Sequence, residues 1–137
     1  MNAPPAECVI AYEPMRGEPD WRAAPFFKGA ALHMLGQDAS VEPFRTAENY
    51  KKICVGQSVA ILIPGTRFDM RGTRHGRGGG WFDRFLSAVP REWVRVGVLF
   101  DHQLSATPLI KASHDEVMDW LLICASHQWS LKSVATL

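Results

Sequence analysis

The sequence is poor in cysteine, in long apolar runs and in excess charge. Its three cysteines, Cys8, Cys54 and Cys124, lie far apart and form no C-x-x-C pair, so the sequence shows neither a zinc signature nor a disulfide framework. We interpret Cys54 and Cys124, which lie in apolar stretches, as buried small hydrophobic residues. The net charge is only +1 at pH 7, which argues against nucleic acid as a partner.

The sequence also lacks a membrane-spanning segment and a signal peptide, which bears on where the protein is located in the cell. No apolar run approaches the roughly 20 residues that a bilayer requires. The first five residues lack the basic and apolar segments of a signal peptide. We therefore expect a cytoplasmic protein with no membrane partner. The 137 residues, 47% of them hydrophobic, suit a single domain spanning 1–137, in which residues 1–6 form a loose tail.

Short apolar segments predict the β-strands of this domain. They are Cys8–Tyr12, Ser58–Ile63, Val94–Phe100 and Trp120–Cys124. Ser58–Ile63 is a continuous β-branched run that ends at Pro64, which is typical of a strand buried on both faces. Proline and glycine interrupt most of the region between residues 13 and 57, where only short helices or turns are expected, at Ala30–Leu35 and Ala47–Ile53.

One longer helix is predicted between the two strongest strands. Trp81–Val89 has apolar residues at helical spacing, and Pro90 ends it. A strand, loop, helix, strand order requires a crossover connection between parallel strands. The fold class is therefore α/β, with a mainly parallel sheet and flanking helices. Ser58–Ile63 and Val94–Phe100 are expected to be central neighbours in that sheet.

A glycine-rich segment, Arg74 to Arg84, leads into the predicted helix. Glycines allow positive φ angles, and successive N–H groups in such a turn can form a concave anion site. We expect Gly79 to be one of the residues with positive φ. Arg74 and Arg77 add donors suited to phosphate. Spacing alone leaves two interpretations open, a phosphate site beyond the end of Ser58–Ile63 or a surface loop with solvated arginines.

A longer pattern around this loop resembles the 5-formyltetrahydrofolate cyclo-ligase family. Members carry an apolar strand ending in Val-Pro-Gly, then Ala-Phe-Asp, then Arg-Leu-Gly-Arg-Gly-Gly-Gly-Tyr-Tyr-Asp-Arg. The corresponding segment here runs from Ile61 to Leu86 in the same order. Val41-Glu42-Pro43 is similar to the family's Ile-x-Glu-Pro turn, and His114-Asp115 to a His-Asp before its last strand.

The resemblance implies an enzyme that uses ATP and Mg²⁺ to convert 5-formyltetrahydrofolate to 5,10-methenyltetrahydrofolate, through a phosphorylated formyl oxygen. It implies that Arg77 faces the transferred phosphoryl group, and that Asp83 and Asp115 bind magnesium. Residues along the loop would hold the nucleotide, namely Arg74, Gly76, Arg77, Gly78, Gly79, Gly80, Trp81 and Phe82. The Tyr-Tyr pair of the family is Trp81-Phe82 here, which keeps stacking surfaces but loses two hydroxyls.

The N-terminal part of the chain can be placed on the family pattern in two ways. Members begin with a basic helix and a strand leading to a Glu that holds the folate. In the first placement, which the spacing to Glu42 favours, this chain is shortened and starts after both. In the second, Tyr12, Glu18 and Asp20 correspond to the family's Tyr…Glu-x-Asp segment.

Three classes of function remain open from the sequence. The chain is a cyclo-ligase-like enzyme, a non-catalytic module that binds a nucleotide or phosphate, or an assembly protein derived from the same fold. We also expect a homo-oligomer, because an open sheet edge or exposed aromatic residues such as Trp21, Phe26 and Phe27 would need cover.

Overall fold

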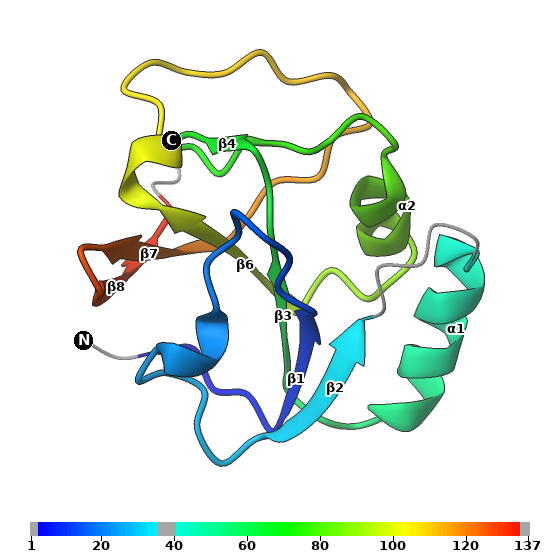
Figure 1. The fold of residues 1–137 in the computed structure, drawn as a ribbon. Coiled ribbons are helices and arrows are strands. Elements are labelled where there is room, and N and C mark those ends of the chain that lie inside the picture. Colours follow the sequence, from blue (N-terminus) through cyan, green and yellow to red (C-terminus); the bar gives the residue numbers. More distant parts are fainter. Residues whose placement is uncertain (1–2, 36–40, 135–137) are drawn as a thin grey trace.

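The computed structural model describes residues 3–35 and 41–134. Its centre is a six-stranded sheet with the order β2-β1-β3-β6-β7-β8 (Figure 1). The strands are β1 Cys8–Tyr12, β2 Ala31–Leu35, β3 Val59–Ile63, β6 Val94–Phe100, β7 Trp120–Ala125 and β8 Gln128–Ser133. A separate short hairpin pairs β4 Arg67–Phe68 with β5 Arg74–His75. The helices are α1 Pro43–Ile53, α2 Trp81–Ser87 and two 3₁₀ turns, Trp21–Ala23 and Asp101–Gln103.

The predicted α/β class and the central strand pair are confirmed. β3 and β6 are parallel neighbours in the middle of the sheet, with Ala60 opposite Val94 and Ile63 opposite Gly97. Every strand pair of this sheet is parallel except β7 with β8. β3 is buried at all five positions, as its unbroken apolar sequence predicted.

The prediction of a helix or turn at Ala30–Leu35 was wrong. Ala31–Leu35 is the edge strand β2, in parallel register with β1, so Cys8 lies opposite Ala31. Five residues are too few for a stable helix, whereas pairing with β1 satisfies the backbone groups of one strand edge. Strand β8 was not predicted. Its sequence is half polar, and its hairpin turn uses Ser126 and His127 at positive φ in place of the usual Asn-Gly.

Both helices differ from their predicted bounds. Helix α1 was expected over Ala47–Ile53 and begins four residues earlier. Pro43 takes the first helical position, where its missing N–H costs nothing, and the Glu42 carboxylate accepts hydrogen bonds from Phe44 N and Arg45 N. Helix α2 ends at Ser87, two residues before the predicted end.

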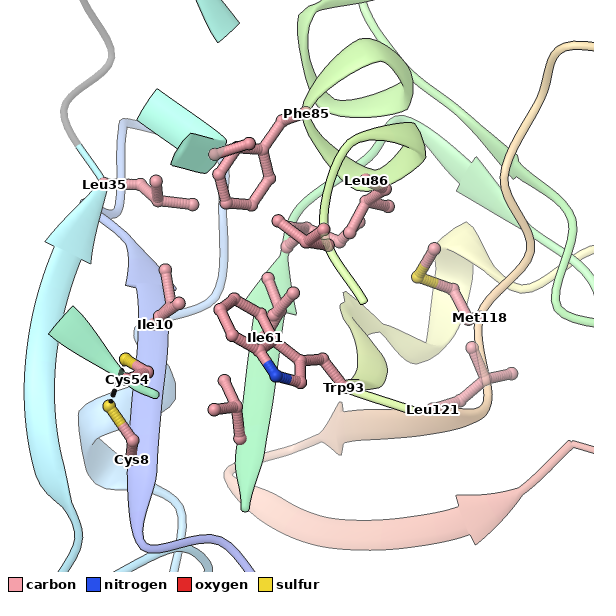
Figure 2. Packing of buried hydrophobic residues seen from close by; sticks show 14 of the residues in the cluster. Cys8, Ile10, Leu35, Cys54, Ile61, Phe85, Leu86, Trp93, Met118 and Leu121 are labelled. Carbon is pink, nitrogen blue, oxygen red and sulfur yellow. Dashed lines mark hydrogen bonds between the residues drawn. The ribbon is translucent and has the colours of Figure 1, made fainter. Parts of the chain in front are cut away.

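Two hydrophobic clusters form the core, one on each face of the sheet. Helices α1 and α2 cover the first face, where Phe85 and Leu86 meet Ile10 and Ile61 (Figures 1 and 2). The second face is covered by the chain between β1 and β2. Cys54 and Cys124 are buried as predicted. In the described part of the chain, no helix combines the length and apolar character needed to cross a membrane.

The expectation of exposed aromatic residues was wrong. Trp21, Phe26 and Phe27 are half-buried and pack against the second cluster within the same chain. The Trp21 indole N–H also donates to the Tyr12 carbonyl, at 2.8 Å, which holds this segment on the sheet. These aromatic residues therefore give no reason for a second copy to cover them.

Self-association remains a prediction, now assigned to a different surface. Strand β2 lies at the edge of the sheet, and its Leu32 is 48% exposed. An unpaired apolar strand edge favours pairing with another chain. We expect dimers in sedimentation velocity at micromolar protein, and Leu32→Lys should shift them toward monomer. Monomer at every concentration in the unaltered protein would contradict this assignment.

A glycine in the hairpin region provides a second prediction. Gly72 has φ of 86°, and a Cβ there would lie 2.4 Å from the Met118 carbonyl oxygen. Gly56 has a similar φ of 75°, but a Cβ there would meet nothing within 4 Å. Alanine at either position carries the cost of positive φ, about 1–2 kcal/mol. We expect Gly72→Ala to destabilise the protein by about 1–3 kcal/mol more than Gly56→Ala, because backbone must also move. Equal urea midpoints would refute the predicted clash.

Candidate functional site

The glycine-rich loop borders a cavity of about 540 Å³ beyond the carboxyl end of β3. The loop follows β5 and ends at α2, so three elements meet at this edge of the sheet. Two more segments complete the wall, the chain after β1 and the loop before β7. The lining residues are Met15, Glu18, Pro64, Gly65, Arg74, His75, Gly76, Arg77, Gly78, Gly79, Gly80, Trp81, Phe82, Asp83, His114 and Asp115. Every site residue predicted from the sequence is among them, although their roles stay predictions.

The glycines of the loop do not all play the same conformational part. Gly78 and Gly80 have φ of 105° and 69°, which side chains rarely adopt. Gly79 does not have positive φ, so the expectation for that residue was wrong. Gly80 caps α2 without a side-chain acceptor, but α2 has only seven residues. A helix this short has a weak dipole, so the attraction of an anion depends more on Arg77 and the loop amides.

Arg74 is buried beneath the loop, with 4% of its surface exposed. Its Nη1 donates to the Pro64 carbonyl at 2.8 Å, and its guanidinium lies 5.4 Å from the centre of the Phe82 ring. Its Nη2 is 4.0 Å from Asp83 Oδ2. Burial lowers the pKa of Arg74, while the charges of Asp83 and Asp115 oppose that shift. Arg74 therefore joins β3, the loop and α2 from within the protein.

Gly76 lies beside the Arg74 guanidinium, which leaves little room for a side chain at position 76. A Cβ at Gly76 would lie 3.0 Å from Arg74 Nη1 and 3.3 Å from its Nη2. A side chain there would require the buried guanidinium to shift by a few tenths of an ångström, so Gly76 packs tightly against Arg74.

Arg77 has the opposite environment, with a side chain that is 60% exposed at the cavity. Its Nη2 lies 3.8 Å from Oε2 of Glu18, whose own side chain is only 7% exposed. Oε1 of Glu18 accepts a hydrogen bond from Met15 N at 2.8 Å. The carboxylate is thereby fixed opposite the loop, although 59 positions separate Glu18 from Arg77 in the sequence. A second hollow of about 530 Å³ shares both residues and also Gly65.

Glu18 is the residue that sequence reasoning undervalued. Its position in the cavity favours the second placement of the N-terminal segment, in which Tyr12, Glu18 and Asp20 correspond to the family's Tyr…Glu-x-Asp segment. The spacing between Glu18 and Glu42 had favoured the first placement, because that comparison assumed that the connection between these two residues has the length usual in the family. The sequence signal that could have identified Glu18 as a site residue was Glu18-Pro19-Asp20, which follows the predicted strand Cys8–Tyr12.

Asp83 and Asp115 reach the cavity from two neighbouring segments, α2 and the loop before β7. Asp83 Oδ1 accepts a hydrogen bond from Glu116 N at 3.0 Å, which ties α2 to the loop before β7. Asp115 Oδ2 accepts from Ala112 N at 2.9 Å, and its Oδ1 lies 3.4 Å from His114 Nε2. The two side chains are 15% and 19% exposed. Both are hard oxygen donors in reach of solvent, so the residues fit a magnesium ion.

The two aromatic residues at the start of α2 are held by the protein itself. The Trp81 indole N–H donates to the Val41 carbonyl at 2.8 Å, and its ring stacks on Phe85 at 5.4 Å. Phe82 carries the Arg74 guanidinium on its face. Both rings line the cavity, but each offers only part of its surface to a ligand.

The loop before β7 is held against the hairpin by a buried carboxylate. Asp69 is 2% exposed and accepts hydrogen bonds from Arg71 N, Thr73 N and Leu109 N. His75 adds a second link, with its Nε2 at 2.7 Å from the Ile110 carbonyl oxygen. These contacts position the segment that carries His114 and Asp115.

An α/β domain with a glycine-rich loop that borders a cavity beyond the carboxyl end of a central strand is typical of proteins that bind phosphorylated ligands. Comparison with known proteins narrows this class. The sequence model of the 5-formyltetrahydrofolate cyclo-ligase family matches residues 41–123, more than half of the chain. The chain belongs to the 5-formyltetrahydrofolate cyclo-ligase family. No curated protein matches the chain.

Two solved structures are similar in fold. The first is the NMR structure of 5,10-methenyltetrahydrofolate synthetase from Aquifex aeolicus, with a TM-score of 0.64 and 21% identity, over 96% of this chain and 74% of that one. The second is a 5,10-methenyltetrahydrofolate synthetase from Mycoplasma pneumoniae, with a TM-score of 0.58 and 21% identity, over 86% and 72% of the two chains. At this identity the similarity establishes a common fold.

Proposed function

We propose that this protein binds ATP at the glycine-rich loop and catalyses the ATP-dependent closure of 5-formyltetrahydrofolate, or of a related formyl compound. The observation that carries the proposal is the meeting of Glu18, Arg77, Asp83 and Asp115 on one cavity of about 540 Å³. Membership of the cyclo-ligase family supports the same reaction. The overall conversion consumes ATP and releases ADP and phosphate, with the formyl oxygen leaving on the phosphate.

Arg77 is the proposed phosphate-binding and catalytic residue. Its guanidinium is exposed, and its ion-pair partner among the described residues is distant, at 3.8 Å, so it can turn toward a ligand. Donors arranged in a fork suit phosphate oxygens, and their charge stabilises negative charge that develops during phosphoryl transfer. Arg77 also borders both hollows, which supports a role between a nucleotide on the loop and a second substrate.

Arg74 is proposed to support the nucleotide site from below. Its hydrogen bond to Pro64 and its contact with Phe82 use much of the guanidinium. A buried positive charge still acts on a bound anion through a medium of low dielectric constant. The direct contacts with the nucleotide come from backbone N–H groups of the loop, those of Gly76, Gly78, Gly79 and Gly80. The rings of Trp81 and Phe82 form the far side of the nucleotide site.

The charge of the cavity supports a requirement for magnesium. Arg74 and Arg77 face three carboxylates, those of Glu18, Asp83 and Asp115, which leaves the lining with one net negative charge when the histidines are neutral. Such a cavity attracts a polyphosphate weakly by itself. Asp83 and Asp115 would hold the ion, which supplies positive charge to the phosphate oxygens when bound.

Glu18 is proposed to bind the second substrate. Its carboxylate is fixed by Met15 N and faces the cavity beside Arg77. A buried carboxylate accepts hydrogen bonds from paired N–H groups, such as those at the edge of a reduced pterin ring. When Arg77 turns toward the phosphates, the Glu18 carboxylate is left to the second substrate.

A non-catalytic nucleotide-binding module is the second candidate. The observation that favours it is the use of Trp81 and Phe82 by the protein's own contacts, together with the absence of hydroxyl groups on both rings. A module of this kind would bind ATP and magnesium without closing a formyl-folate ring.

One assay separates these functions. Purified protein is titrated with ATP and Mg²⁺ by calorimetry, and is then incubated with both and 5-formyltetrahydrofolate while ADP and the methenyl product are measured. Equal amounts of the two products support the enzyme. Binding without product supports the module, and a protein that binds no nucleotide at millimolar ATP refutes both.

The first variant to test is Arg77→Ala. Loss of a charge-assisted contact of about 1.5–3 kcal/mol should weaken ATP binding by about ten- to a hundredfold. Arg71→Ala is the matched control, because Arg71 is exposed on the same segment but does not line the cavity. Calorimetry measures both affinities. Similar losses in the two variants would show a general effect of surface charge and contradict the proposed contact.

The Asp83→Asn variant tests whether Asp83 is a ligand of Mg²⁺. The amide oxygen can still accept the hydrogen bond from Glu116 N, so the link between α2 and the neighbouring loop is preserved. We expect ATP affinity measured in a chelator to change little. The gain in affinity on adding Mg²⁺ should fall by about tenfold, because asparagine is a weaker ligand for the ion. An undiminished gain in this variant would remove Asp83 from the proposed metal site.

A further inference from the structure

Cys8, His33 and Cys54 come together at the end of the sheet opposite the cavity. One ligand atom from each of the three side chains lies within 4.8 Å of the other two. Cys8 Sγ and Cys54 Sγ are 2.8 Å apart, and Figure 2 shows this pair beside Ile10. Cys8 is the first residue of β1, and Cys54 is the residue that caps the carboxyl end of α1.

The parallel register explains why His33 joins the two cysteines. His33 lies opposite Ile10, and side chains two positions apart on a strand share a face, so Cys8 and His33 both face α1. Residues from two strands and one helix end thus converge on a site that no linear motif encodes. This is why the spacing of the cysteines showed no zinc signature.

We propose that Cys8, His33 and Cys54 form a binding site for Zn²⁺ that is separate from the nucleotide cavity. Two thiolates and one imidazole are preferred ligands of this ion, and three protein ligands leave its fourth position to water. The charges also match, because Zn²⁺ with two thiolates is neutral. A neutral group is tolerated beside the apolar side chains Ile10 and Val59 of the same cluster, whereas Cu⁺ with the same ligands would leave a buried negative charge.

The surroundings allow such an ion to enter and be held. Cys8 and Cys54 are buried, but His33 lies on the edge strand and is half-buried, so the site is accessible from its imidazole side. The His33 ring packs edge-on against Tyr50 at 5.8 Å, which limits its orientation. Zinc–sulfur bonds of about 2.3 Å place two sulfurs roughly 3.7 Å apart, so the thiols must separate by about 1 Å through side-chain rotation.

Burial and the neighbouring Cys8 raise the pKa of the Cys54 thiol to about 12, which disfavours a free, reactive thiolate at this position. Cysteine binds Zn²⁺ as the thiolate, so an ion at this site would displace thiol protons. A disulfide between Cys8 and Cys54 would instead need a two-electron oxidant and a thiolate, which this environment disfavours, and it would not involve His33.

The test uses the reduced chain of residues 1–137 with Co²⁺ and Zn²⁺ as probes. We expect one Co²⁺ per chain, with the thiolate charge-transfer band and the visible bands of a tetrahedral site, and displacement by equimolar Zn²⁺. His33→Phe should weaken Zn²⁺ binding by at least about tenfold, and Cys54→Ser should abolish the charge-transfer band. Cys124→Ser is the matched control, since Cys124 is a buried cysteine outside the group.

Each outcome decides the proposal. Absence of a tetrahedral Co²⁺ spectrum at millimolar metal would overturn it. A disulfide between Cys8 and Cys54 would also overturn it. Its signature is a mass two hydrogens below that of the reduced chain, measured on metal-free protein that has not been treated with reductant. The His33→Phe variant would then show the same loss of mass. If Cys54→Ser does not fold by circular dichroism, His33→Phe decides alone: excess Zn²⁺ should raise the melting temperature of the unaltered protein and not of this variant.

Discussion

The buried charge of Arg74 is the interaction on which the candidate site depends. Arg74 belongs to β5, donates to the carbonyl of Pro64 at the end of β3, and lies over the ring of Phe82 in α2. Asp83, which opposes the loss of charge on burial, also receives a hydrogen bond from the loop that carries Asp115. One guanidinium thus links four segments around the cavity. Its Nε finds no hydrogen-bond partner among residues 3–35 and 41–134, so these links must offset a cost of burial.

The central part of the fold followed from sequence because its physical causes are local. β3 is a continuous apolar run and β6 is apolar apart from Arg95 and Gly97, and a loop and a helix between them require a parallel crossover. The same reasoning placed the glycine-rich loop at the carboxyl edge of the sheet. Strands β2 and β8 were missed because they are short or half polar, and only pairing with a neighbouring strand makes them extended.

The site was predicted in part for a similar reason. Residues from Arg74 to Asp83 are contiguous, so one pattern identified all of them together with Asp115. Glu18 comes from a different strand connection, and only the assembled sheet brings it to within 3.8 Å of Arg77. The group of Cys8, His33 and Cys54 is the extreme case, because its three members share no segment. Contacts between distant segments are what a single sequence reveals least.

Gly97 shows how a residue that touches no ligand can set the shape of a binding site. It lies in β6 directly behind the hairpin, and a Cβ there would come within 2.5 Å of the Phe68 ring. A larger residue would force Phe68 to shift, and Phe68 belongs to the β4–β5 hairpin that carries Arg74. The position of one wall of the cavity thus depends on a strand residue that does not line it.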